Sequence, residues 1–239
     1  MNTALILVIL GLIPSAIWLL FYLRKDKRPE PNEMVIKIFV YGMAVTLPAA
    51  LIEWRFIEVL KNLNLSSAVT TAIYFLVGVA FVEELAKYLI IKFRVLRDHE
   101  FDEPVDAMIY MIIVGLGFAA LENILILSLL REPYLLEKTI YALSGRFIGA
   151  TFLHALCSAN IGFFLALSLL KTKKRLLLLS LGLFISTILH GLFNIGIKME
   201  GWYGTAMVIT ILVGLFILVL YQFKKVKKLL SVCRVRRVS

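Results

Sequence analysis

The chain has 239 residues, of which 61% are apolar and 18% charged, and its mean hydropathy is +0.91. This composition excludes an ordinary soluble domain, and the length leaves room for about seven membrane spans. The net charge of +10 comes from short basic clusters between apolar runs, a pattern typical of membrane topology rather than of nucleic-acid binding. Two cysteines, Cys157 and Cys233, are too few for a disulfide framework or a zinc ribbon. We therefore expect an all-α, polytopic integral membrane protein that binds no nucleic acid.

Seven apolar stretches alternate with polar connections along the chain. They cover residues 3–23, 34–53, 68–93, 105–130, 141–170, 176–197 and 204–222. Alternate connections, together with the C-terminal tail, carry eighteen Lys and Arg residues on one side, against five on the other. The positive-inside rule then predicts a multi-pass protein of the cell membrane with its N-terminus outside and its C-terminus cytoplasmic. The basic tail, Lys224 to Arg237, is expected to contact anionic lipid headgroups.

We expect one membrane domain over residues 1–239. Its chemistry-bearing core is expected at about 68–200, with peripheral spans and the basic tail in 1–67 and 201–239. The division rests on where polar residues fall inside apolar spans, since such residues are costly in lipid and mark candidate functional sites.

The third span contains FVEELAKY, which places Glu83, Glu84 and Lys87 deep in an apolar run. Lys87 is three residues from Glu84 and four from Glu83, so it can reach either carboxylate on one helix. Each ionised group at the centre of a membrane helix costs roughly 2.5 to 3.5 kcal/mol, so these residues are candidates for function.

The next three spans each carry polar or small residues spaced four apart, which places them on one helix face. These are Phe118 and Glu122 in the fourth span, Ala150, His154, Ser158 and Gly162 in the fifth, and His190 and Asn194 in the sixth. Small residues let membrane helices approach closely, so the fifth span is expected to have a close neighbour. Gly115 and Gly117 make the fourth span suited to the same kind of packing.

Depth in the membrane brings these residues together. With a rise of about 1.5 Å per residue, Glu122, His154 and His190 lie roughly 25, 25 and 21 Å from the cytoplasmic ends of their helices. Glu83 reaches the same level if the third helix is long and continues to Arg97. We therefore expect a cluster somewhat outside the bilayer midplane, towards the extracytoplasmic face.

The expected cluster contains more acidic than basic groups. Three carboxylates, on Glu83, Glu84 and Glu122, face the single ammonium of Lys87. At least one carboxylate must hold a proton, pair with an imidazolium or bind a metal, and enzymes and transporters use all three arrangements. The structural alternatives are interhelical hydrogen bonds from His and Asn, and a Glu-Lys pair that neutralises itself.

The motifs resemble those of a known family. EELAK at 83–87, EPVDAMIY at 103–110, GFAALEN at 117–123, HALCSA at 154–159 and HGLFN at 190–194 resemble the PrsW family of intramembrane proteases. That family is related to the wider CPBP group, which includes the CAAX prenyl endopeptidases. The resemblance matches EExxK to Glu83, Glu84 and Lys87, FxxxE to Phe118 and Glu122, and HxxxN to His190 and Asn194, with His154 as the other family histidine. Histidine typically replaces the FxxxE glutamate in the CAAX enzymes, so Glu122 favours the PrsW branch.

The resemblance implies a membrane-embedded endopeptidase, which in the best-known cases cuts a membrane-anchored anti-sigma factor on its extracytoplasmic side. Amide hydrolysis needs an activated water and donors for the oxyanion. Our hypothesis makes either Glu83 or Glu84 the general base, with the other held by Lys87. His154 and Glu122 would position the water or shuttle its proton, and His190 with Asn194 would bind the oxyanion. Phe118 and Ser158 are supporting residues.

Three alternatives remain open at the level of sequence. His154, His190, Glu84 and Glu122 could bind a divalent metal such as zinc, although the chain has no HExxH motif; a glutamate-type enzyme would need no cofactor. A proton-coupled transporter could use the same Glu and His relay, but no inverted repeat is evident. A non-catalytic membrane scaffold would use the polar cluster only to hold its helices together.

Overall fold

A computed structural model describes residues 3–24, 30–129, 145 and 149–229. These residues form helices joined by short turns, with no strand among them. The elements are α1 (Thr3–Leu23), α2 (Asn32–Lys61), α3 (Ser67–Ile73), the π-helix η1 (Tyr74–Phe81), α4 (Val82–Arg94), α5 (Asp106–Leu129), α7 (Ala150–Leu170), the short 3-10 helix η2 (Thr172–Lys174), α8 (Arg175–Lys198) and α9 (Trp202–Val226). The all-α prediction is confirmed for this part of the chain.

Seven helical segments within the described residues are long and apolar enough to cross a membrane. They coincide with the seven expected spans, although α2 runs from Asn32 to Lys61 rather than over 34–53. The fifth span was expected from residue 141; most of its first nine residues lie outside the described ranges, and α7 begins at Ala150. Long apolar stretches bounded by charged or turn residues thus predicted the number and order of the spans.

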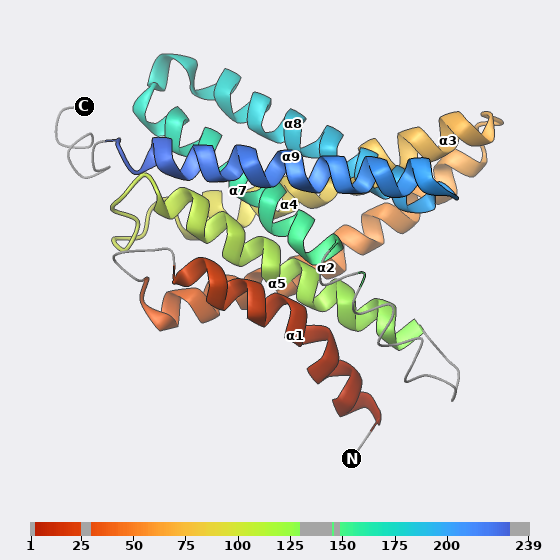
Figure 1. Ribbon diagram of the computed structural model, residues 1–239, viewed down its shortest axis with the longest axis horizontal. Coiled ribbons are helices and arrows are strands. Elements are labelled where there is room, and N and C mark those ends of the chain that lie inside the picture. Colours follow the sequence, from red (N-terminus) through yellow and green to blue (C-terminus); the bar gives the residue numbers. More distant parts are fainter. Residues whose placement is uncertain (1–2, 25–29, 130–144, 146–148, 230–239) are drawn as a thin grey trace.

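The ends of successive helices alternate between the two ends of the bundle (Figure 1). The connection from α4 to α5, the η2 turn from α7 to α8 and the last turn of α9 lie together at the left of the view. The connections from α2 to α3 and from α8 to α9 lie at the opposite end. The alternation expected from the basic clusters is therefore present in the fold.

Helices α5 and α7 form the centre of the bundle. They pack along each other, and α5 also contacts α1, α2 and α4, while α7 contacts α8 and α9. Both central helices are apolar around most of their circumference, as expected for helices enclosed by others. The outer helices instead expose many large apolar side chains, including Leu51, Phe184 and Ile217, which suits a surface facing lipid.

The glycines of α5 allow this close packing. A Cβ atom at Gly117 would collide with the backbone carbonyl of Phe39 in α2. Further along α2, the hydroxyl of Thr46 donates a hydrogen bond to the backbone carbonyl of Phe118 in α5 at 3.3 Å. Backbone contact of this kind confirms the expectation that small residues hold these membrane helices together.

The third span is built from α3, η1 and α4, which follow one another without a break over Ser67–Arg94. It is long, as expected, but it ends at Arg94 and does not continue to Arg97. Its central eight residues, Tyr74–Phe81, are π-helical, with wider turns than an α-helix. These wide turns come directly before Glu83 and Glu84, and they were not predicted.

Candidate active site

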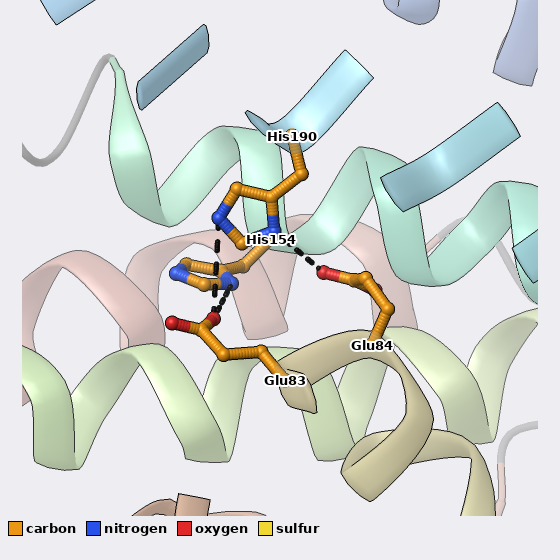
Figure 2. Close-up of side chains that lie close together, drawn as sticks. All are labelled: Glu83, Glu84, His154 and His190. Atoms are coloured by element: carbon orange, nitrogen blue, oxygen red, sulfur yellow. Dashed lines mark hydrogen bonds and ion pairs between the residues drawn. The ribbon is translucent and has the colours of Figure 1, made fainter. Parts of the chain in front are cut away.

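Four buried side chains from three helices meet in the middle of the bundle. Glu83 and Glu84 come from α4, His154 from α7 and His190 from α8 (Figure 2). Each is at most 4% exposed, and one nitrogen or oxygen of each lies within 4.8 Å of those of the other three. The structure therefore brings together the carboxylates and imidazoles that their depths predicted.

Adjacent residues on a helix point about 100° apart, so α4 can bury both glutamates only by being enclosed on more than one side. It contacts α2, α5, α7 and α8. Glu84 Oε1 lies 2.9 Å from His190 Nδ1, whereas Glu83 Oε2 lies between the two histidine rings. The two carboxylates consequently have different partners.

Lys87, one turn after the two glutamates in α4, connects the members of the cluster. Its Nζ lies 2.8 Å from Glu84 Oε1, 2.8 Å from His154 Nδ1 and 3.5 Å from Glu83 Oε2. An ammonium group can only donate hydrogen bonds, so His154 must accept at Nδ1. The expectation that Lys87 pairs with a neighbouring carboxylate is borne out, and Glu84 is the nearer partner.

Glu122 of α5 fixes the other side of His154. Its Oε2 lies 2.9 Å from His154 Nε2, and its side chain is 27% exposed, whereas the histidine is buried. With Nδ1 accepting from Lys87, a neutral His154 carries its proton on Nε2 and donates it to Glu122. The ring is thereby held in one tautomer and one orientation.

His190 has the opposite arrangement. Its Nδ1 donates to Glu84 Oε1, so the neutral ring presents the lone pair of Nε2 to Glu83 Oε2, 3.9 Å away. Glu83 Oε2 is also 3.7 Å from His154 Nδ1. This buried carboxylate oxygen accepts no hydrogen bond from the residues that the structure describes, although Lys87 Nζ lies 3.5 Å away.

Phe118 contacts the same cluster, and Ser158 and Asn194 each lie one turn from one of its histidines. The Phe118 ring lies 4.6 Å from Lys87 Nζ and 5.6 Å from the His154 ring. Ser158, one turn after His154, has a buried hydroxyl without a hydrogen-bond partner, and Gly115 of α5 lies against it. Asn194, one turn after His190, is half-buried and forms no side-chain hydrogen bond within the described part of the chain.

Comparison with known proteins agrees with this geometry. The family described as PrsW family intramembrane metalloprotease matches residues 30–221. The chain belongs to the PrsW family. This PrsW protein is therefore a membrane-embedded protease of the cell membrane, and the protease interpretation is confirmed over the transporter and scaffold alternatives.

Curated relatives of this PrsW protein cover most of its length. It is 27% identical over 216 residues to Protease PrsW of Oceanobacillus iheyensis, covering 90% of this chain and 93% of the relative. It is 29% identical over 225 residues to Protease PrsW of Geobacillus kaustophilus, covering 93% and 91%. Protease PrsW of Bacillus subtilis is 30% identical over 186 residues, covering 77% and 79%. No solved structure matches this PrsW protein.

One charged residue near the site was missed from sequence. The first two spans of this PrsW protein were expected to be peripheral to its chemistry-bearing core. Glu53 of α2 is half-buried, however, and lies close enough to Glu122, Lys87 and Glu83 to interact with them electrostatically. Its position near the end of the expected second span, beside Trp54 and Arg55, resembled an interfacial residue, and only the path of α2 along α5 reveals its proximity.

The donor set of this PrsW protein fits a divalent metal ion. Lys87 Nζ lies 2.8 Å from Glu84 Oε1 and from His154 Nδ1 and 3.5 Å from Glu83 Oε2, but Glu83 Oε2 and Glu84 Oε2 are buried oxygens that accept no hydrogen bond from the described residues. Glu83 Oε2 lies 3.9 Å from His190 Nε2, whose lone pair faces it. Carboxylate oxygen and imidazole nitrogen are the ligands that zinc takes in catalytic sites. The ligand group thus contains Glu83, which was not among the metal candidates, whereas Glu122 lies at the other nitrogen of His154.

Proposed function

We propose that this PrsW protein hydrolyses a peptide bond of a membrane-anchored protein, with Glu83 as the general base for the attacking water. The observation that carries the proposal is the buried Oε2 of Glu83, which lies between two imidazole rings, 3.5 Å from Lys87 Nζ, and accepts no hydrogen bond from the described residues. A carboxylate held in this way can take a proton from water without first breaking a protein hydrogen bond. Glu84 Oε2 likewise accepts no hydrogen bond from the described residues, but Lys87 and His190 both contact Glu84 at Oε1, so its carboxylate is the more closely charge-compensated of the two.

The remaining residues hold and move protons. Glu83 takes the proton from water as its oxygen attacks the carbonyl carbon, and then delivers it to the leaving amine. With Glu84 beside Nδ1 to balance its charge, the His190 ring can carry a proton on Nε2 and donate it to the oxyanion, together with the carboxamide of Asn194. Lys87 and Glu122 keep His154 in place beside the water. Phe118 and Ser158 pack around this arrangement.

A metal ion is the cofactor that the family description implies. Glu84 and His190 would hold it, with His154 as a further nearby donor, which leaves Glu83 to accept the proton of the water. When bound, a divalent ion such as zinc supplies a Lewis acid for the carbonyl or for the water. Glu83 would still accept the proton of the attacking water and deliver it to the leaving amine.

We further propose that the N-terminus lies outside and the basic end of the bundle lies in the cytoplasm, as the eighteen-to-five distribution of Lys and Arg favours. His154 is four residues from the start of α7, and Glu122 is seven from the end of α5, or about 6 and 10 Å from those ends of their helices, which face away from the basic end of the bundle. The peptide would then be cut towards the extracytoplasmic face. An anti-sigma factor with one membrane span is the substrate class that the family resemblance suggests.

The test is cleavage of co-expressed single-pass membrane proteins, anti-sigma factors among them, by the wild type and by Glu83→Gln. The variant keeps the size of the side chain and removes the base, so cleavage should fall by about 10²-fold or more. The matched control is Glu58→Gln, since Glu58 is an exposed glutamate of α2 that pairs with Lys61 at 3.4 Å, at the surface. Full cleavage by Glu83→Gln at equal membrane levels would remove Glu83 from the role of base.

A further inference from the structure

A cavity lies at the end of the bundle that carries the η2 turn, away from the glutamate and histidine cluster. Its volume is about 710 Å³, and it opens between α4, α7 and α8. It is lined by Tyr88 and Lys92 of α4, Ile161 of α7, Thr172 and Lys173 of η2, and Arg175, Leu176, Leu179, Ser180 and Leu183 of α8. The lining is apolar on one side and basic at its rim.

Three cations and no carboxylate border this cavity in the described part of the chain. Lys92, Lys173 and Arg175 come from two separate parts of the chain, and the fold places them around one opening. None of the three forms an ion pair with any acid among the described residues. The Arg175 guanidinium is also close enough to the half-buried Tyr88 to act electrostatically on it. The rim thus presents uncompensated positive charge together with hydroxyl donors from Thr172 and Tyr88.

The cavity continues as an apolar furrow along α8. A neighbouring cavity of about 480 Å³ shares Ser180 and Leu183 with it and extends to Phe184 and Thr187, against Phe81 of η1. From Arg175 to Thr187, α8 rises about 18 Å. Half of a hydrocarbon core of about 30 Å is about 15 Å. The basic rim and the furrow together therefore span about one leaflet.

We propose that this cavity binds an anionic phospholipid, with its phosphate at Lys92, Lys173 and Arg175 and an acyl chain in the furrow beside Leu183 and Phe184. A molecule with negative charge at one end and hydrocarbon at the other matches both halves of the surface. Basic pockets between membrane helices are a recognised way of holding acidic headgroups. The furrow ends at Phe81 and Thr187, each three residues before a member of the glutamate and histidine cluster, Glu84 and His190. The bound lipid would therefore reach along α8 and η1 to the level of the site.

The experiment is native mass spectrometry of the full chain in detergent, titrated with phosphatidylglycerol or with phosphatidylcholine of the same acyl chains. Wild type should bind one phosphatidylglycerol at least about tenfold more tightly than phosphatidylcholine, and the triple variant Lys92→Gln, Lys173→Gln, Arg175→Gln should lose that preference. The matched control is Lys171→Gln with Lys174→Gln, because both lysines belong to the same turn but do not line the cavity. It should keep the preference within about twofold.

Two further measurements test whether binding depends on the acyl chain as well as on the phosphate, and whether the occupant of the cavity is a lipid or a protein. Leu183→Trp fills the furrow without changing charge and should weaken binding of phosphatidylglycerol, whereas inorganic phosphate alone should not compete at equal concentration. A photo-crosslinking residue at position 183 in cell membranes should give a phospholipid adduct. The proposal is overturned if the triple variant binds phosphatidylglycerol like the wild type, or if position 183 crosslinks to a protein instead. All variants should elute as the wild type does on size exclusion, and a variant that does not is replaced by its single-site members.

Discussion

Glu83 Oε2 and His190 Nε2 face each other across 3.9 Å with no hydrogen bond between them. With His190 Nδ1 donating to Glu84, both facing atoms present lone pairs. Two acceptors at this distance in a buried site require a proton, a water or a cation between them, because an unpartnered buried acceptor is costly. This relationship makes the space between Glu83 and His190 the place where the reaction components are expected.

The first prediction concerns metal at this space. We expect protein purified without chelator to retain about one zinc or similar divalent ion per chain. The variant His190→Asn should lose this ion, because His190 Nε2, unlike His190 Nδ1 and both nitrogens of His154, makes no hydrogen bond with the described residues. Elemental analysis of both proteins measures this directly. Chelation should stop cleavage and added metal should restore it. A wild type that is fully active with no metal would instead show that the carboxylates suffice.

The second prediction concerns Lys87 and Glu84, which lie 2.8 Å apart with both side chains fully buried. Lys87→Gln leaves Glu84 without its ammonium partner and should destabilise the fold by about 3 to 5 kcal/mol. Removing both charges together should cost clearly less than the sum of the single changes, while cleavage stays absent in the double variant. Thermal unfolding in detergent measures the coupling.

Lys61→Gln is the control for that cycle, because Lys61 pairs with Glu58 at the exposed surface and should contribute at most about 1 kcal/mol. Strictly additive effects of the Lys87 and Glu84 substitutions would contradict a direct interaction between the two groups.

The third prediction compares Glu122 and Glu53 as positioning residues. Glu122 bonds directly to His154, so Glu122→Gln should lower kcat by about 10- to 100-fold with little change in KM. Glu53 acts on the cluster only through its charge, so Glu53→Gln should lower kcat by less than about tenfold. Kinetics with a purified single-span substrate distinguish the two. An effect of Glu53→Gln equal to that of Glu122→Gln would place Glu53 among the direct partners of the site.

The fourth prediction tests the close approach of α5 and α7. A Cβ atom at Gly115 would collide with Ser158 Oγ and lies 3.0 Å from the His154 carbonyl oxygen, so Gly115→Ala should displace α7 and the histidine that it carries. We expect a loss of about 1 to 3 kcal/mol in stability and a larger loss of activity. Gly214→Ala is the control, because no other part of the described chain lies within 4 Å of a Cβ there. Equal melting temperatures and activities for the two variants would contradict this account.

Much of the fold could be predicted because the membrane restricts it. Apolar length and basic clusters determined the spans, and the rise per residue placed Glu122, His154 and His190 at one level. These rules depend only on composition and regular helix geometry. The cluster formed as predicted for this reason, although the third helix ends at Arg94.

What could not be predicted depends on how the helices turn and cross. Nothing in Tyr74–Phe81 signals π-helical turns, since the segment is uniformly apolar. The proximity of Glu53 arises from the path of α2 beside α5, which contacts such as that of Thr46 with Phe118 fix. The choice of Glu84 rather than Glu83 as the closer partner of Lys87 was likewise open, because spacings of three and four residues both permit contact.

The π-helical segment also limits how the length of the chain can vary. A π-helical turn holds more residues than an α-helical turn and forms where one extra residue is inserted into an α-helix. Removing one residue from Tyr74–Phe81 would therefore let this segment form an ordinary α-helix. Each residue of a helix turns the chain by about 100°. Removing one residue would therefore rotate α4, with Glu83 and Glu84, relative to α3, and at least one of the two helices would lose its packing in the bundle. Deleting Val77, whose side chain is exposed, should therefore abolish cleavage, whereas deleting Asn64 in the turn before α3 should not. Relatives that keep the activity should vary in length within such turns and not within this segment.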